Sequence, residues 1–370
     1  MKILFIAPIP PPINGQSKAS LVLLEALNSK HQVDVVNLSK STLKNGALSV
    51  TRISEILSNI RRIYGKQNNQ DIIYISLAES FAGNIRDIVF YCLSRKNLSR
   101  TFIHMLGGAG MKEILGGTGI MQKINAHFMK KMAGVIVEGP VNFETFKTVF
   151  PEDRIHIVPN FAEDFLFVSE REINDKFDNL SVINVLYLSN LIPGKGYDEL
   201  ADAFILLELD EKTQLNITFV GGFENVESER AFLNKIKPLP QLKYLGKFID
   251  GQQKRELYCE SHVFCLPTYY PFEGQPISIL EAYATGCAVI TSDHSGIPFI
   301  FKDQQNGFLV EKKSIISLKK ALLKLISRKD DLKRIAKFNR IESFKKYRTE
   351  IFQNTIIEIF EDFIVEGKNK

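Results

Sequence analysis

Residues 267–296 read PTYYPFEGQPISILEAYATGCAVITSDHSG, and this stretch carries the pattern that decides the fold. The apolar run from Val263 to Pro267 predicts a strand, and Ile277 to Thr285 predicts a helix. A second strand is predicted from Ala288 to Ser292. Strand, helix and strand in this order form the unit of a parallel α/β sheet, in which the loop after the first strand is a common ligand site.

Two glutamates flank or lie within the predicted helix. Pro276 occupies the first turn, where its missing N–H costs nothing, and Gly286 fits a left-handed helix end. Glu273 precedes the helix, and Glu281 is the only charged residue within 277–284, so it needs a partner. Free N–H groups at the helix start suit a phosphate, and the carboxylates suit ribose or sugar hydroxyls. The alternative, a first-turn glutamate and a surface glutamate, fits the apolar context of Glu281 less well.

Working outward, short β-branched runs recur along the chain, each followed by a turn signal and an amphipathic stretch. The expected strands are Lys2 to Ala7, Gln32 to Asn37, Asp71 to Leu77, Thr101 to Leu106, Gly134 to Glu138, Ile155 to Val158, Asn184 to Ser189, Leu215 to Val220, Leu242 to Leu245, Val263 to Pro267, Ala288 to Ser292 and Phe308 to Val310. The polar, acidic stretch 161–180 interrupts the pattern without periodicity. We therefore expect two α/β domains with a linker there, and a long helical pattern over 331–363.

Composition agrees with two soluble-type domains. The chain has 370 residues, of which 45% are hydrophobic and 24% are charged. Lys and Arg total 47 against 42 Asp and Glu, a net charge of +5 that is too small to favour duplex DNA binding. No run of apolar residues reaches the length of a spanning helix, and the first residues predict a strand rather than a signal peptide.

The cysteines and histidines predict no metal centre. The four cysteines contain no C-x-x-C pair, which favours a reducing cytoplasm over a disulfide framework. The six histidines show no spacing that would put two imidazoles on one helical face. D-x-D is absent from the chain as well, so we expect no carboxylate pair for a diphosphate-bound metal and no cofactor.

Two further loops follow predicted strands in the first half. The loop Pro8 to Ser17 is rich in proline and delivers Gly15 to a helix start, where an anion or a plain helix cap fits equally well. It matches neither the G-x-G-x-x-G nor the G-x-x-x-x-G-K-[ST] phosphate loop. The loop 107–119 holds six glycines just after His104, which is either a functional residue at a strand end or a satisfied histidine inside a strand.

The segment E-G-Q-P-x-S-I-L-E-A-x-A-x-G-x-x-V-I, with seven residues between Glu273 and Glu281, resembles the signature of the family 4 retaining glycosyltransferases. The resemblance covers nearly the whole chain. Matching segments are Gly15 in the first loop, Ile157-Val158-Pro159-Asn160, Leu186 to Leu191 leading to Lys195-Gly196, Phe219 to Gly222, Tyr244 to Gly246 and Asn306 to Val310. It implies the GT-B plan of two Rossmann-like domains facing across a cleft.

The resemblance also implies domain limits. It gives an acceptor-binding domain over 1–165, a linker over 166–180 and a nucleotide-sugar donor domain over 181–344. A terminal helix, about 345–370, is expected to pack back on the first domain.

Residue roles follow from the same resemblance. Glu281 would bind the ribose, Glu273 the donor sugar hydroxyls and Lys195 the diphosphate. The full donor-binding set is Gly15, Asn190, Lys195, Gly221, Glu273, Gly274, Gln275, Pro276, Ile277 and Glu281. The catalytic set is Glu273, Lys195 and His104. Lys195 and the free N–H groups would hold the charge of the departing diphosphate, with transfer expected to be metal-independent and retaining, by attack on the leaving-group face.

Three departures from the family pattern bear on these roles. Relatives commonly carry Gly-Arg-Leu where this chain has Ser189-Asn190-Leu191, so a diphosphate-clamping guanidinium is missing and Lys195 would bear more charge. Asn14 stands where a second glycine is often found, and Leu106 where a histidine often precedes the glycine loop.

Basic residues gather at three places, which are Arg95-Lys96 with Arg100, Lys123 with His127, Lys130 and Lys131, and Lys345-Lys346 with Arg348. The helical stretch 120–132 has an apolar stripe, so it fits either an anionic membrane surface or its own sheet. We expect a cytoplasmic hexosyltransferase, peripheral at the inner membrane face if at all, that moves a sugar from a UDP- or GDP-sugar to a sugar or lipid-linked saccharide in surface polysaccharide, O-antigen or capsule biosynthesis. The alternatives are a catalytically silent nucleotide-sugar-binding partner and a nucleotide-sugar epimerase.

Overall fold

The structure is a computed structural model, and two compact units make up the chain. It describes residues 1–11, 13–39, 50–78, 80–246 and 249–368. One unit comprises Met1–Asn160 with Glu350–Lys370, and the other comprises Phe161–Thr349.

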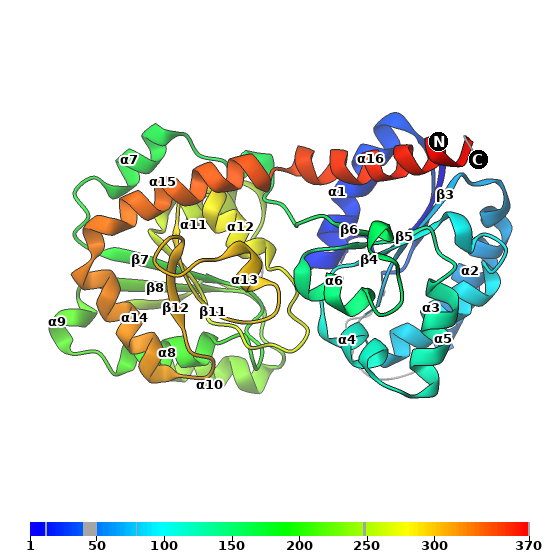
Figure 1. Cartoon of the computed structure of the whole chain (residues 1–370). Helices are drawn as coiled ribbons and strands as arrows, with labels where there is room; N and C mark the ends of the chain where they lie inside the picture. Colours follow the sequence, from blue (N-terminus) through cyan, green and yellow to red (C-terminus); the bar gives the residue numbers. More distant parts are fainter. Residues whose placement is uncertain (12, 40–49, 79, 247–248, 369–370) are drawn as a thin grey trace. The chain divides into compact units, whose positions relative to one another are not determined.

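The first unit is a six-stranded parallel sheet in the order β2-β1-β3-β4-β5-β6. Its strands are β1 (Lys2–Ala7), β2 (Gln32–Asn37), β3 (Ile72–Ser76), β4 (Thr101–Met105), β5 (Gly134–Val137) and β6 (Ile155–Ile157). Its helices are α1 (Gly15–Lys30), α2 (Val50–Lys66), α3 (Phe81–Leu93), α4 (Ala109–Gly116), α5 (Ile120–Met129), α6 (Pro140–Phe146) and α16 (Thr349–Lys368) (Figure 1). Since helices cover both faces, β1, β3 and β4 are apolar and buried nearly throughout.

The last helix, α16, packs on the first unit although it is the end of the chain. Its Phe360 ring lies 5.1 Å from the ring of Phe102 on β4 and 6.4 Å from that of Tyr74 on β3. Gln353 donates a hydrogen bond to the carbonyl oxygen of Val22 on α1 at 2.9 Å. Residues 350–368 therefore complete the core of a sheet whose strands lie about two hundred or more residues earlier.

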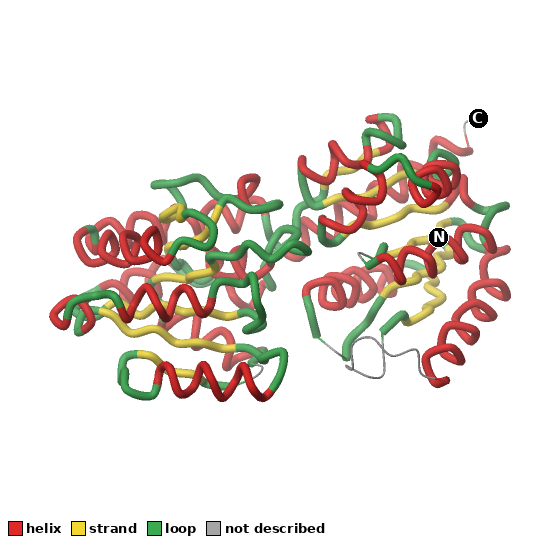
Figure 2. The backbone as a smooth tube through the Cα atoms, turned by 90° about the horizontal axis from the view of Figure 1, so that it is seen from below, coloured by secondary structure: helices red, strands yellow, loops and turns green. Residues whose placement is uncertain are grey.

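The second unit is also a six-stranded parallel sheet, in the order β12-β11-β10-β7-β8-β9. Its strands are β7 (Ile183–Leu188), β8 (Leu215–Val220), β9 (Leu242–Tyr244), β10 (Val263–Leu266), β11 (Ala288–Ser292) and β12 (Gly307–Val310). Its helices are α7 (Glu170–Phe177), α8 (Tyr197–Ile205), α9 (Leu209–Lys212), α10 (Val226–Ile236), α11 (Gly251–Glu260), α12 (Ile277–Ala284), α13 (Ile297–Ile300), α14 (Ile315–Ser327) and α15 (Lys329–Lys346). Helices lie on both faces of each sheet (Figure 2).

The strand order of the second unit creates a switch point. From β7 the chain adds β8 and β9 on one side and then returns to add β10, β11 and β12 on the other. The loops after β7 and β10 therefore diverge from adjacent strands, and in open α/β sheets ligands bind at this position. The fold class expected from the sequence, two Rossmann-like α/β domains, is confirmed, and each of the twelve expected strands is present.

Two segments differ from their sequence expectation. The expected linker 166–180 contains α7, because Ser169 and Glu172 form a capping box at its start and Ile173 and Phe177 enter the core of the second unit. The helical pattern expected over 331–363 forms two helices, because α15 ends at Tyr347 before α16 begins.

None of the helices in the described part of the chain combines the length and apolar content that crossing a bilayer requires.

Candidate functional site

The site centres on a lysine and a glutamate from the two loops of the switch point in the second unit. Lys195 follows β7, and its Nζ lies 2.8 Å from Oε2 of Glu273, which follows β10. Their side chains are 13% and 9% exposed, so the pair is sheltered but reachable. The Thr268 hydroxyl donates a second hydrogen bond to the same carboxylate oxygen at 2.9 Å, and the Lys195 ammonium lies 5.0 Å from the centre of the Tyr270 ring.

Two glycines hold the loop after β7 against the loop after β10. Gly194 and Gly196 have φ values of +91° and +82°, a backbone conformation that favours glycine. A Cβ atom at Gly196 would lie 2.5 Å from the carbonyl oxygen of Pro267, so a larger residue would separate the loops. The Gly194 carbonyl oxygen accepts a hydrogen bond from the Tyr269 N–H at 2.6 Å, which fixes the distance across which Lys195 reaches Glu273.

Gly221, after β8, lies against the same loop. Its φ is +145°, and a Cβ atom there would lie 1.9 Å from the carbonyl oxygen of Ser189. Asn190, next along, has an exposed side chain. The Tyr187 hydroxyl lies 3.3 Å from the carbonyl oxygen of Asn190 and 3.4 Å from that of Lys195. Gly221 therefore contributes close backbone packing, and the exposed Asn190 side chain is reachable by a ligand.

The segment from Gly274 to Ile277 leads from Glu273 into α12. The Gly296 N–H donates to the Gly274 carbonyl oxygen at 3.2 Å, and the Gln275 side chain is buried. Pro276 is the N-cap residue of α12, one position before the first turn where the sequence placed it. The amide groups of the first turn of α12 begin at Ile277, directly after the loop that carries Glu273.

Glu281, one of the two predicted glutamates, is buried in α12 and already has partners. Its Oε1 lies 2.8 Å from Nζ of Lys254 on α11, and its Oε2 lies 3.2 Å from the Tyr258 hydroxyl. Burial, together with the nearby Glu281 charge, holds the pKa of Tyr258 well above its usual range, so this hydroxyl keeps its proton at neutral pH and can donate a hydrogen bond. The sequence showed that Glu281 needs a partner, whereas Lys254 itself was missed. In the structure Lys254 stands one helical turn from the buried Tyr258, on the same face of α11, and no sequence signal marks its contact with Glu281.

In the first unit, Gly15 is the exposed first residue of α1. The helix is capped by Asn14, whose side chain accepts a hydrogen bond from the Ser17 N–H at 2.9 Å. Gln16 donates to the Ser76 hydroxyl and to the Leu77 carbonyl oxygen, so the start of α1 is tied to the end of β3. Pro12 of the predicted loop lies outside the described residues.

His104 is entirely buried in β4, so direct contact with a substrate does not fit its position. Its Nδ1 lies 2.7 Å from the Tyr74 hydroxyl, and its ring lies 6.2 Å from that of Phe352 on α16. Burial lowers the pKa of His104 to about 3, which keeps the imidazole neutral. The position at a strand end suggested a functional residue, but α16 covers it, and the alternative of a histidine inside a strand matches this environment.

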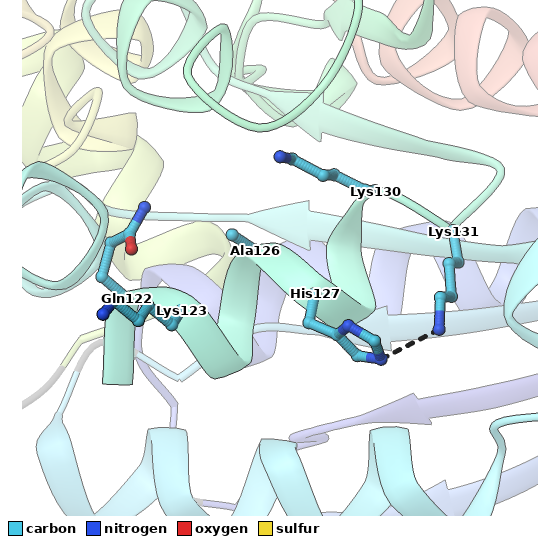
Figure 3. Close-up of a pocket in the computed structure, with 6 residues that line it drawn as sticks. All are labelled: Gln122, Lys123, Ala126, His127, Lys130 and Lys131. Carbon is cyan, nitrogen blue, oxygen red and sulfur yellow. Dashed lines mark hydrogen bonds between the residues drawn. The ribbon is translucent and has the colours of Figure 1, made fainter. Parts of the chain in front are cut away.

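A basic hollow of about 430 Å³ lies along α5 in the first unit. Figure 3 shows its lining side chains, which are Gln122, Lys123, Ala126, His127, Lys130 and Lys131. The Lys131 ammonium lies 2.9 Å from Nε2 of His127, as drawn in Figure 3. Ile120, at the start of the same helix, is 72% exposed.

Across the part of the chain that the structure describes, no three His, Cys, Asp or Glu residues come together in a group that could hold a metal ion.

Comparisons with known proteins agree with this arrangement. The profile of the family described as "Glycosyl transferases group 1" matches residues 169–341, which include both glutamates and Lys195. An uncharacterized glycosyltransferase of Methanocaldococcus jannaschii is 24% identical over 241 residues, covering 61% of this chain and 57% of that relative. The capsular polysaccharide biosynthesis glycosyltransferase CapM of Staphylococcus aureus is 22% identical over 209 residues, covering 55% of this chain and 53% of CapM. The chain thus aligns with little more than half the length of these relatives.

Solved structures extend the likeness to both units. HepE of Anabaena, crystallised with UDP and glucose, superposes with a TM-score of 0.70 at 16% identity, covering 98% of this chain and 99% of HepE. At this identity the likeness concerns the fold. Family profile, relatives and fold agree: residues 169–341 belong to the group 1 glycosyltransferases, also called family 4, and the two units together have the fold of solved GT-B glycosyltransferases.

Proposed function

We propose that the chain is a retaining, metal-independent hexosyltransferase that moves a sugar from a nucleoside diphosphate sugar to a sugar or a lipid-linked saccharide. The second unit would hold the donor and the first unit the acceptor. The observation that carries this proposal is the Lys195 to Glu273 pair, because its two loops meet at the switch point where α/β sheets bind ligands.

The pair supplies the charges that this reaction needs. When the glycosidic bond to the nucleotide breaks, negative charge develops on the departing diphosphate, and a fixed ammonium nearby stabilises it. Lys195 would turn from Glu273 to the diphosphate, with Gln275 and Ile277 contributing N–H groups. Glu273, held by Thr268, would accept hydrogen bonds from the donor sugar hydroxyls.

Other members of the predicted set would shape the nucleotide part of the site. Glu281 would accept hydrogen bonds from the ribose hydroxyls, since a carboxylate is a pure acceptor. Gly221 and Gly274 would allow backbone to approach the donor, Pro276 would set the entry into α12, and the exposed Asn190 would reach the diphosphate as a neutral donor. His104 is left out because it is buried.

The biological setting is part of the proposal. CapM is described as acting in capsular polysaccharide biosynthesis, and HepE was crystallised with UDP and glucose. These descriptions favour surface polysaccharide assembly and a uridine nucleotide as the first donor to test. A lipid-linked acceptor would bring the protein to the inner face of the membrane from the cytoplasm, and the basic hollow on α5 would then face anionic headgroups.

The alternative of a catalytically silent nucleotide-sugar-binding partner is favoured by Asn190, where an amide replaces a diphosphate-clamping guanidinium, and by Asn14, which stands where a second glycine is often found. This alternative predicts that the donor binds but is not turned over, so an assay of nucleoside diphosphate release distinguishes it from the main proposal.

The test is release of nucleoside diphosphate from a panel of UDP- and GDP-sugars, with and without saccharide acceptors, after a thermal-shift screen for donors that stabilise the protein. Wild type is expected to release diphosphate from at least one donor, with EDTA having no effect and the product keeping the anomeric configuration of the donor. Glu273→Ala is expected to abolish release. The matched control Glu170→Ala, which removes a glutamate paired with Lys337 on the surface of the same unit, keeps it.

Donor binding without turnover in wild type would favour the silent-partner alternative. Absence of stabilisation by every nucleotide and nucleotide sugar would contradict the donor site itself.

A further inference from the structure

Lys254, a buried lysine on α11, joins Glu281 to two further carboxylates. Its Nζ lies 2.8 Å from Oε1 of Glu281, 3.0 Å from Oε2 of Glu163 and 3.2 Å from Oδ1 of Asp250. The side chains of Lys254 and Glu281 are 4% and 5% exposed, so this contact is made away from water. None of the roles proposed above uses Lys254.

Burial makes the charge of Glu281 dependent on this lysine. A carboxylate that is removed from water without a partner is strongly destabilised, and removing one member of a buried ion pair leaves the other uncompensated. Without the Lys254 ammonium, Glu281 would lose the positive charge that balances it. Glu163 and Asp250, which contact the same ammonium, would lose it too. The acceptor character of Glu281 therefore depends on Lys254.

Geometry gives Lys254 a second effect. It contacts Oε1 of Glu281, while the Tyr258 hydroxyl lies 3.2 Å from Oε2 and 3.1 Å from the Ser278 carbonyl oxygen. Contacts on both oxygens fix the plane of the carboxylate. An ionised carboxylate only accepts hydrogen bonds, so a Glu281 fixed in this way would present its oxygen atoms as acceptors to hydroxyl groups of a ligand.

We propose that Lys254 is a positioning residue that keeps Glu281 ionised and oriented for the ribose hydroxyls of a nucleoside diphosphate. The inference rests on the proposed donor site, and it adds that discrimination for ribose depends on a residue that does not touch the nucleotide.

The experiment measures, by isothermal titration of the full chain, the Kd values of UDP and GDP and of the 2′-deoxy form of whichever binds. The readout is the ratio of the deoxy Kd to the ribose Kd. Loss of a hydrogen bond to a charged group costs about tenfold in affinity, so wild type is expected to show a ratio of about ten.

In Lys254→Met, which keeps the length of the apolar stem, the ratio is expected to fall to within about twofold of unity because ribose binding weakens and deoxyribose binding does not. The matched control is Lys235→Met, which removes a lysine that also joins two carboxylates, Asp198 and Asp202, in the same unit. Its ratio is expected to equal that of wild type. Should Lys254→Met fail to fold, Lys254→Gln carries the test, since a neutral amide cannot balance the buried charge.

A folded Lys254 variant that keeps the wild-type ratio overturns the inference, as does one that binds the ribonucleotide more tightly, because Lys254 would then compete with ribose. Both outcomes leave nucleotide binding and turnover by wild type intact, so the proposed function survives them. Wild type that binds neither UDP nor GDP and turns over no nucleotide sugar overturns the proposed function, and this inference with it.

Discussion

The second unit contains two lysine–glutamate pairs that have the same chemistry and different surroundings. Lys195 and Glu273 are 13% and 9% exposed and come from two loops, whereas Lys254 and Glu281 are 4% and 5% exposed and come from two helices. A partly reachable pair on loops can exchange its partners when a charged ligand arrives. A buried pair on helices keeps its partners, because separating buried charges is costly. This difference underlies our proposal that the first pair acts in bond breaking and the second in holding the nucleotide in place.

The largest expected effect comes from breaking the loop pair. Lys195→Met removes the ammonium that would stabilise the departing diphosphate, and kcat is expected to fall by about 10²-fold or more. The unfolding temperature is also expected to fall, since Glu273 is only 9% exposed and loses its charged partner, so kcat is measured at a temperature at which the variant is folded. Steady-state kinetics and thermal unfolding check both parts, with Lys337→Met, a surface lysine paired with Glu170, as control. A variant that keeps its kcat would remove Lys195 from the reaction.

A third lysine, Lys176, tests whether the loss of any buried or partly buried lysine ammonium in the second unit changes the preference for ribose over deoxyribose. The Lys176 ammonium lies 2.7–3.3 Å from the carbonyl oxygens of Tyr258, Ser261, Thr285 and Gly286, at the ends of α11 and α12. Lys176→Met is expected to lower the free energy of unfolding by about 2–3 kcal/mol, because charge-assisted hydrogen bonds to buried carbonyl groups are lost. Urea unfolding measures this loss. The ribose-to-deoxyribose ratio of Kd values should remain that of wild type, and a lowered ratio would mean that the ratio reports general loosening.

Acid is expected to weaken both units through buried histidines. Burial lowers the pKa of His104 in the first unit to about 3 and that of His262 in the second unit to about 4. Because the unfolded value is about 6.5, the unfolded chain binds more protons below this pH, so stability is full above pH 6.5 and falls as pH drops toward the folded pKa values. The loss is about 1.4 kcal/mol per pH unit for each imidazole.

Urea unfolding between about pH 7 and pH 5 measures this slope. His104→Phe should make the dependence of the unfolding free energy on pH shallower by the contribution of one imidazole. An unchanged slope would contradict the lowered pKa of His104. Comparisons of the two pairs are therefore made above pH 7.

The smallest expected effect tests whether Glu163 contributes to nucleotide binding together with Lys254 and Glu281. Glu163 shares the Lys254 ammonium with Glu281, but its side chain is 24% exposed. Since Lys254 keeps Glu281 and Asp250, Glu163→Gln is expected to change nucleotide affinity by less than about twofold, as for other partly exposed ion pairs. Titration with UDP and GDP tests it, and a loss as large as that of Lys254→Met would extend the functional pair to Glu163.

The sequence predicted those features that depend on local pattern. Twelve strands followed from short β-branched runs, and Glu273 and Glu281 followed from their places before and within one apolar helix. Lys254 could not be predicted as the partner of Glu281, because the contact joins two helices and depends on their packing. The sequence left two alternatives open for His104, and it could not decide between them for a similar reason, since the helix that covers this residue begins at Thr349.

The expected linker shows the limit of composition. Six of the fifteen residues in 166–180 are charged, yet two apolar residues four apart, Ile173 and Phe177, enter the core of the second unit from α7, which Ser169 caps. Gly286, at φ +66°, allows this contact, because a Cβ atom there would lie 2.8 Å from Ile173 Cγ1. The capping box at its start was visible in the sequence.

The central claim is that the donor binds at the switch point of the second unit. Hydrogen–deuterium exchange of the full chain with and without saturating UDP or GDP tests it most directly. The account predicts slower exchange in the loop 189–196, in the loop 267–276 and in the first turn of α12, with α8, α14 and the buried β4 unchanged. Protection confined to other segments, with none in the loops that carry Lys195 and Glu273, would contradict it.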